Sequence, residues 1–249
     1  MSKTLRERLA AKRKEIQERA SSGNGNLIFI KEGTYRVRVL SGEEGQEWAY
    51  EIAHMYLGPE IKGIISPSSM GLDCPIMEKI AELKESKGAD ATNLIKTLRP
   101  KSRFLLPVVV YKDERGKEID EENSGKLMLI TGGLYGQMID FFLDPDLGDF
   151  TDPQEGYDLK IKRTGKGMTD TEYSVSAMRP TPITGKWSKP INLESMVKAV
   201  IPSYDDVEEK LAEFMAINDP DGNTDDHEGG DAGSQPRPRK RKKRSEDGE

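Results

Sequence analysis

The alternation of apolar and polar residues is clearest between residues 157 and 178. Apolar residues occupy every second position in YDLKIKR at 157–163, and again in EYSVSAM at 172–178. A period of two is typical of strands, and the Gly-containing TGKG turn between the segments favours a hairpin. One face of this hairpin is apolar, and the other carries lysines and hydroxyl groups. Such a sheet can pack on a core with one face and bind a polyanion with the other.

This hairpin ends a longer stretch, 103–179, around which we expect the rest of the chain to be organised. The stretch opens with an apolar run at 104–111, where Pro107 favours an edge strand or a bulge. A polar turn then leads into the apolar run LMLIT at 127–131. The segment after it predicts a helix, since its apolar residues recur at helical spacing. They are Leu134, Met138, Phe141 and Phe142.

Similar patterns precede and follow this stretch. The segment 31–40 predicts a strand in which apolar residues alternate with Arg36 and Arg38, so that both arginines lie opposite the apolar face. The segment 75–97 is typical of one or two helices, and 192–217 carries two helical patterns. These patterns indicate a mainly β fold with peripheral helices, of the α+β class.

Changes in composition divide the chain into four parts. Residues 1–26 form a basic arm and a flexible joint, and residues 27–190 form the core, including a helical subdomain near 75–98. Residues 191–218 are expected to be C-terminal helices. Residues 219–249 are acidic and then basic, lack apolar residues to bury, and are predicted to be disordered.

Composition and charge narrow the class of protein. The 249 residues are 35% hydrophobic and 33% charged, with a net charge of −6 that conceals strong segregation by sign. A single cysteine excludes an internal disulfide framework and indicates a reducing compartment. No apolar run approaches the roughly 18–20 residues that cross a bilayer. The N-terminus has no apolar stretch typical of a secretory signal. We therefore expect an intracellular protein.

Catalytic chemistry finds little support in the sequence. Of the two histidines, His227 falls in the tail, and His54 and Cys74 lack a third partner or an oxyanion-type motif. A structural histidine and a buried cysteine are the simpler interpretation. The aspartates at 144–153 miss the calcium-loop spacing, and helix-ending turns explain them. We expect no enzyme activity.

Several ordered blocks within residues 27–185 resemble phage single-stranded DNA-binding proteins, the helix-destabilising replication proteins. They are CPIMEKI, RPKSRFLLPVVVYKD, NSGKLMLI, GLYGQMIDFFLD, DPDLGDF, YDLKIKRTGKG and TEYSVSAMRPTPI. The resemblance implies an OB-fold-like barrel core that coats and protects single strands, with little sequence preference, during phage DNA replication, recombination and repair in the host cytoplasm. It also implies a basic N-terminal arm for cooperative binding between neighbouring copies, and an acidic C-terminal tail that contacts replication proteins.

Two features depart from the family pattern. Well-known members bind zinc through one His and three Cys, but here Cys74-Pro75 is followed by Met77 where a second Cys is expected. His54 and Cys74 alone cannot complete a tetrahedral site, so no zinc or other cofactor is expected. The second departure is the tail, which ends with the basic block RPRKRKKR before SEDGE.

Binding of single strands requires a basic groove and aromatic rings on which bases stack. The best candidates are Arg36, Arg38, Lys160 and Lys162, because strand alternation turns them away from the apolar face. The other groove candidates are Lys101, Arg103, Lys112, Arg163 and Lys166. The stacking candidates are Trp48, Tyr56, Tyr111 and Tyr135, although each of these rings also suits a core.

Two alternatives remain open. In the first, the basic tail binds nucleic acid in a packaging or interaction protein, and the core is only a scaffold. In the second, the clustered aspartates serve a nuclease or another phosphoryl-transfer enzyme. Binding measured without the tail separates the first from the main hypothesis, and a cleavage assay with divalent metal tests the second.

Overall fold

The computed structural model describes residues 27–86, 88–120, 125–165, 167 and 170–218. The predicted arm at 1–26, the predicted tail at 219–249 and the groove candidate Lys166 lie outside the described residues. The strands are β1 (Leu27–Phe29), β2 (Gly33–Val39), β3 (Tyr50–Tyr56), β4 (Gly63–Ile65), β5 (Lys101–Lys112), β6 (Gly125–Thr131), β7 (Tyr157–Thr164) and β8 (Glu172–Pro180). The helices are α2 (Pro75–Ser86), α3 (Ala89–Leu98), α5 (Gly132–Leu143), α6 (Leu193–Lys198) and α7 (Tyr204–Asn218). Two short 3₁₀ turns are η1 (Pro67–Met70) and η2 (Gly185–Ser188).

The strands form one mixed sheet in which β5 is the central member. The main path runs β1-β6-β5-β2-β7-β8, and β3 joins it by pairing with β5 and with β4. Only the β1–β6 pair is parallel among the described strands. The mainly β class with peripheral helices is confirmed. The OB-like core is an open sheet rather than a closed barrel, because no pairing joins β1 to β8 in the described part of the chain.

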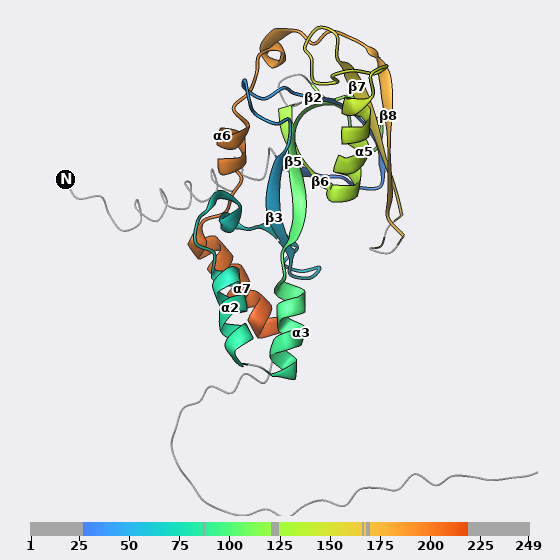
Figure 1. Ribbon diagram of the computed structural model, residues 1–249. Coiled ribbons are helices and arrows are strands. Elements are labelled where there is room, and N and C mark those ends of the chain that lie inside the picture. Colours follow the sequence, from blue (N-terminus) through green and yellow to red (C-terminus); the bar gives the residue numbers. More distant parts are fainter. Residues whose placement is uncertain (1–26, 87, 121–124, 166, 168–169, 219–249) are drawn as a thin grey trace, which may run out of the picture.

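The main core lies between the sheet and α5, which Figure 1 shows beside β7 and β8. Val37 of β2, Met128 of β6 and Leu159 of β7 are fully buried there, together with Leu134 and Met138 of α5. The helix begins where the Thr131 hydroxyl accepts a hydrogen bond from the backbone N–H of Leu134, the usual role of an N-cap side chain.

A second apolar cluster holds α2, α3 and α7 together at the other end of the molecule (Figure 1). Ile76 and Leu98 are fully buried against Val207 and Phe214 of α7. The segment 75–97, predicted as one or two helices, forms α2 and α3. Helix α7 comes from the predicted C-terminal segment and packs on α2, so the helical unit combines two distant parts of the chain.

A third cluster connects these two regions. Leu193 and Val197 of α6 pack on Ile52 of β3 and Leu105 of β5. The longest described helix, α7, has 15 residues. None of the helices in the described ranges has the length and apolar character needed to span a membrane.

Candidate nucleic-acid interface

Basic side chains line up across three neighbouring strands. Lys112 of β5 lies opposite Arg36 of β2, and Arg36 lies opposite Lys160 of β7. Lys160 in turn lies opposite Ser176 of β8. Directly paired residues project from the same face of a sheet, so these four side chains share one face.

A second row runs beside the first on the same face. Lys162 of β7 pairs with Thr34 of β2 and with Ser174 of β8. Lys160 and Lys162 are both exposed. Neither forms an ion pair with another described residue. The two rows are called the basic face below.

The basic face contains a hollow of about 500 Å³. Its lining residues come from β2, β5, the loop after β5, β7 and β8, and are Gly33, Thr34, Tyr35, Arg36, Lys112, Glu114, Arg115, Gly116, Lys160 and Met178. Glu114 accepts a hydrogen bond from the Tyr35 hydroxyl at 3.3 Å and lies 3.7 Å from the Lys31 ammonium. Glu114 is therefore partly neutralised by its own neighbours.

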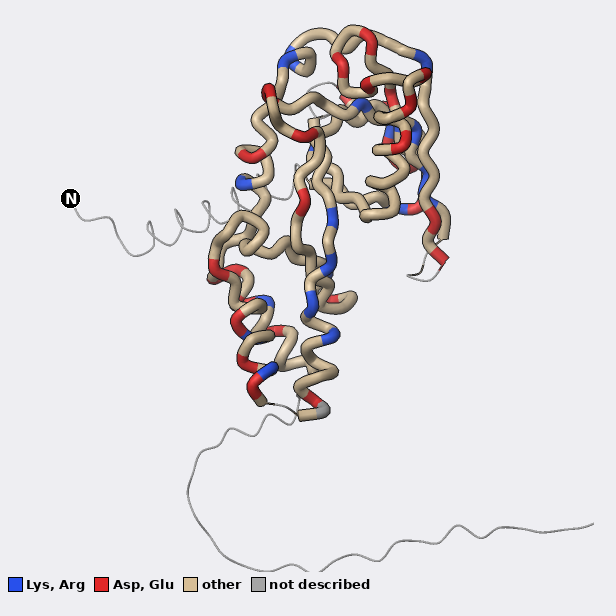
Figure 2. The backbone as a smooth tube through the Cα atoms, viewed as in Figure 1, with Lys and Arg blue, Asp and Glu red and all other residues tan. Residues whose placement is uncertain are grey.

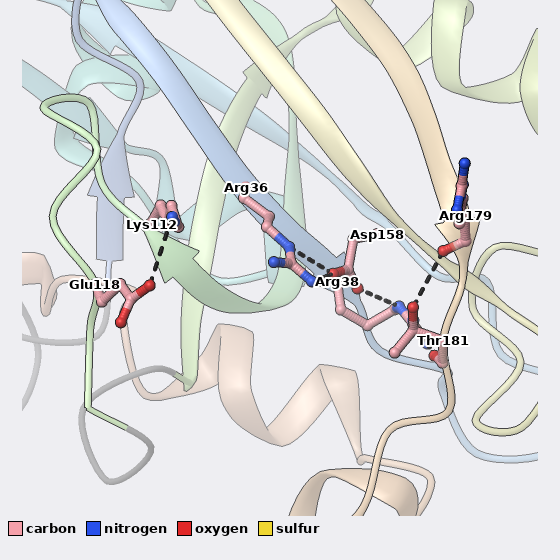
Figure 3. A network of polar contacts seen from close by, with 7 residues as sticks. All are labelled: Arg36, Arg38, Lys112, Glu118, Asp158, Arg179 and Thr181. Carbon is pink, nitrogen blue, oxygen red and sulfur yellow. Dashed lines mark hydrogen bonds and ion pairs between the residues drawn. The ribbon is translucent and has the colours of Figure 1, made fainter.

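Arg36 and Arg38 both bind the carboxylate of Asp158 (Figure 3). The Arg36 Nε and Nη2 atoms lie 2.8 and 2.6 Å from Asp158 Oδ2, and Arg38 Nε donates to Oδ1 at 3.0 Å. Arg38 also donates from Nη2 to the backbone carbonyl of Thr181. These contacts link β2 to β7 and to the chain after β8.

The predicted exposure of Arg38 is wrong, because this side chain is 1% exposed. Alternation does place it on the same face as Arg36. However, the segment after β8 covers that end of the face, where the Thr181 carbonyl and Asp158 enclose the guanidinium. Arg36 lies farther along β2, and 37% of its side chain is exposed.

Arg163 lies on the opposite face of β7 from the lysines. Its Nη1 atom donates to the carbonyl of Ile30 at 2.5 Å, and its guanidinium lies 6.0 Å from the centre of the Tyr173 ring. These contacts connect β7 to the chain after β1 and to β8. The structure therefore does not place Arg163 on the basic face.

The aromatic candidates occupy different environments. Tyr135 stacks on Phe104 at 3.9 Å between ring centres, and Trp48 packs on Tyr135 at 4.9 Å, so both are partly buried at the edge of the main core. Tyr111 is half-buried, with the Arg36 guanidinium 5.2 Å above its ring centre. Tyr56 is 49% exposed at the end of β3.

Lys101 and Arg103 lie far from the basic face, at the start of β5. They pair with His54 and Ile52 of β3. Lys101 is eleven residues before Lys112 along β5, roughly 35 Å of extended strand. The predicted groove residues are therefore split between the two ends of β5, and Figure 2 shows basic positions on the part of this strand near α3.

The described residues do not bring together the donor set of a family-type zinc site. Cys74 is buried in the apolar cluster of the helical unit, where its Sγ accepts a hydrogen bond from the Ser66 hydroxyl at 3.3 Å. Met77 is 37% exposed on α2. No group of three or more His, Cys, Asp or Glu side chains suited to a metal occurs in the described residues.

His54 is held in a partly buried position without a polar partner for one nitrogen. A Cβ atom on Gly63 would lie 2.3 Å from its Nε2, so the ring packs directly over this glycine. Its Nε2 atom is buried and makes no hydrogen bond in the described part of the chain. Burial, together with the positive charge of Arg103, lowers the pKa of His54 to about 4.

Asp158 is a component of this face that was not among the residues predicted from the sequence. Its signal was available, because Asp158 is the one acidic residue among the outward positions of YDLKIKR, which otherwise carry Lys160 and Lys162. An acidic residue in a basic row suggests a partner for a cation on a neighbouring strand. Met178 was also missed, although it lines the hollow.

Comparison with known proteins gives one family. The family model described as "gp32 DNA binding protein like" matches residues 31–215, which extend from just before β2 into α7 and include the basic face and the helical unit. A search of curated proteins found no match.

Proposed function

The chain belongs to the gp32-like DNA-binding protein family, and from this premise we propose that it binds single-stranded DNA through the basic face. In this proposal it coats and protects single strands during phage DNA replication, recombination and repair, in the cytoplasm of the host. Its role is binding without catalysis and without strong sequence preference.

The observation that carries this proposal is the row Lys112–Arg36–Lys160 beside the hollow. Neighbouring strands lie about 4.8 Å apart, so the three cations fall within about 10 Å across the sheet. Lys112 lies 3.5 Å from Glu118 and Arg36 is paired with Asp158, whereas Lys160 forms no ion pair among the described residues. A row of basic residues of this kind can track a phosphate backbone, and phosphate contacts carry no base information. This supports binding that is independent of sequence.

The chemistry of the hollow favours a single strand over a duplex. Met178 of β8 lines the hollow together with Arg36 and Lys160 and is 37% exposed, so it gives the hollow an apolar surface. The bases of a single strand are accessible to such a surface, whereas those of a duplex are stacked and paired inside the helix. We therefore expect the protein to bind single-stranded DNA more tightly than duplex DNA.

The test is a charge reversal of Lys160 and Lys162 to Glu. Binding to single-stranded oligonucleotides should weaken for all sequences alike. The slope of log K against log salt should decrease in magnitude by about 1.4, since each single-strand phosphate contact contributes about 0.7. The matched control reverses Lys96 of α3 and Lys198 of α6, which are also exposed but lie away from the basic face. Equal affinity of the wild type and the Lys160/Lys162 variant would place DNA elsewhere on the protein.

The basic block at 237–244 supports a second candidate, in which the tail is the main binder. A chain that ends at Asn218 keeps every described element and loses this block. If the core is the binding site, this shortened chain should retain its preference for single strands over duplex DNA at moderate salt. Loss of all single-strand binding on truncation would instead identify a packaging or interaction protein that binds through its tail.

A further inference from the structure

We propose that Asp158 is a positioning residue, which fixes the guanidinium of Arg36 in a ready orientation for a DNA phosphate at the hollow. This inference rests on the proposed function, and it identifies Arg36 as the orientation-dependent contact of the basic face. Lys160 and Lys162 then contribute mainly charge.

The first support is the geometry of the Arg36–Asp158 pair. A single carboxylate oxygen, Asp158 Oδ2, lies 2.8 Å from Arg36 Nε and 2.6 Å from Arg36 Nη2. One edge of the guanidinium is thereby held, and the Tyr111 ring, 5.2 Å away, lies against one of its faces. None of these contacts uses Arg36 Nη1, which leaves donor hydrogens for a ligand on a side chain that is 37% exposed.

The second support is that Asp158 itself is firmly held. Its side chain is 3% exposed, and its other oxygen accepts from Arg38 Nε at 3.0 Å. Arg38 is anchored in turn to the Thr181 carbonyl (Figure 3). Since two guanidinium groups share one carboxylate, the cluster retains one net positive charge. The carboxylate therefore orients Arg36 without cancelling the attraction for a phosphate.

Two irregularities in strand pairing surround this cluster. The β2–β5 register shifts between Arg36 and Val37, which gives β5 an additional residue at Tyr111. The β7–β8 register shifts between Tyr157 and Leu159, the neighbours of Asp158. Bulges re-aim side chains and are frequent beside functional sites. Here, one bulge brings Tyr111 next to Arg36, and the other occurs at Asp158.

Lys160 and Lys162 lack comparable restraints, whereas Lys112 lies 3.5 Å from the carboxylate of Glu118. Lys160 and Lys162 are exposed and have no ion pair among the described residues. A lysine ammonium is a compact charge on a flexible stem, whereas a guanidinium offers a planar set of donors that matches a phosphate. Replacement of Arg36 by Lys should therefore remove orientation while it keeps the charge.

The main test compares Arg36→Lys with Arg99→Lys, two substitutions of the same kind, of which the second is at an exposed position after α3, away from the basic face. We expect Arg36→Lys to raise the Kd for a short single-stranded oligonucleotide about tenfold, because it loses the planar, carboxylate-held donor. The slope of log K against log salt should stay unchanged, since the variant keeps the positive charge at this position. Arg99→Lys should bind like the wild type. An unchanged Kd for Arg36→Lys, with thermal unfolding as in the wild type, would overturn the inference.

The second test removes the carboxylate with Asp158→Asn. This change removes one negative charge from the face, so charge alone predicts tighter binding. Positioning predicts the opposite, a higher Kd for the folded variant. Equal or tighter binding by folded Asp158→Asn would overturn the inference. If this variant does not fold, because Arg38 is left buried without its counter-ion, the Arg36→Lys comparison decides the question.

The two proposals fail in different ways. If the wild type shows no preference for single strands, or if the Lys160/Lys162 reversal leaves binding intact, the proposed function is wrong. If both of those results are as expected and Arg36→Lys leaves the Kd unchanged, DNA binds at the basic face and only the role proposed for Asp158 is wrong.

Discussion

His54 is a residue whose environment favours its neutral form. Its ring packs over Gly63, its Nε2 atom is buried, and Arg103 adds an unfavourable positive charge. The pKa of His54 is accordingly lowered from 6.5 to about 4. Between these two values the unfolded chain binds a proton that the folded chain does not. The stability of the folded protein should therefore decrease as the pH falls from about 6.5 towards 4.

This linkage predicts the behaviour of His54→Gln. On going from pH 7 to pH 5 the wild type should lose about 2 kcal/mol more unfolding free energy than the variant, since glutamine takes up no proton. Urea unfolding of both proteins at the two pH values measures this difference. Carboxylates and the second histidine, His227, are common to both proteins and cancel in the comparison. Parallel losses in the two proteins would show that His54 titrates normally.

At the level of single residues, the sequence predicted on which face of a strand a side chain lies better than it predicted whether that side chain is buried. The period-two pattern correctly placed Lys160 and Lys162 on a solvent-exposed face, and their contact with DNA stays a prediction. The same pattern could not reveal that Arg38 is buried. That outcome depends on Asp158, 120 residues away, and on the segment at Thr181 that covers the site.

At the level of elements, the helical unit of α2, α3 and α7 is held by apolar packing. Cys74, Ile76 and Leu98 are buried in it against Val207 and Phe214. A structural zinc site contributes folding energy that a chelator removes. The apolar cluster gives this unit a source of stability that does not depend on a metal.

We therefore predict that metal removal leaves the protein unchanged. Elemental analysis of the purified protein should show no stoichiometric zinc. The thermal unfolding midpoint should be the same with and without a strong chelator, because His54 and Cys74 are not joined into a ligand set. One zinc per chain that resists mild chelation would contradict this prediction.

The contribution of α7 to this unit can be measured with two substitutions on one helix. Phe214 is 3% exposed in the cluster, whereas Ile217 is 49% exposed. Phe214→Ala should lower the unfolding free energy by about 3–5 kcal/mol through lost burial and a residual cavity. Ile217→Ala should have little effect and serves as the matched control. Similar small losses in both variants would mean that α7 does not support the helical unit.

Elements with a long, regular pattern were predictable, and short ones were not. The segments that became β7, β8 and α5 were recognisable from periodicity and from the TGKG turn. The segment of β5 was recognisable from its apolar run, but the edge position that Pro107 favoured is wrong, because β5 pairs with β2, β3 and β6. By contrast, β1 and β4 have three residues each, too few for a pattern to appear. They exist because β6 and β3 provide partners, which is information from elsewhere in the chain.

At the scale of the whole molecule, the charges are separated along the chain. Residues 3–19 carry seven basic and three acidic side chains, and the core presents its basic face on β2, β5 and β7. We propose that the arm contacts neighbouring copies on the same strand and that the tail contacts replication proteins. Both segments lie outside the described residues.

Deletion of residues 1–22 tests the role proposed for the arm. The core should keep its fold, because every described element begins after this segment. Affinity for an oligonucleotide that accommodates one protein should change little, and cooperative binding to long strands should be lost. Titrations on both lengths at one salt concentration distinguish the outcomes. An equal loss on short and long strands would mean that the arm only adds phosphate contacts.

The sequence pattern could not predict whether the sheet closes into a barrel. Each predicted strand indicates its own two faces, but nothing in its pattern states which strand pairs with which. The resemblance implied a barrel, whereas β1 and β8 remain two separate ends of the sheet in the described residues. Strand order depends on pairings between distant segments, such as β1 with β6.

The burial of Cys74 has a practical consequence. The chain has one cysteine, which is 3% exposed and receives a hydrogen bond from Ser66. A buried thiol of this kind reacts slowly with alkylating reagents. A second cysteine introduced at exposed Ser176, opposite Lys160, would therefore take up a maleimide dye selectively. The native protein therefore needs no removal of its own cysteine before labelling. The emission of a dye at position 176 would report the binding of single-stranded DNA in real time.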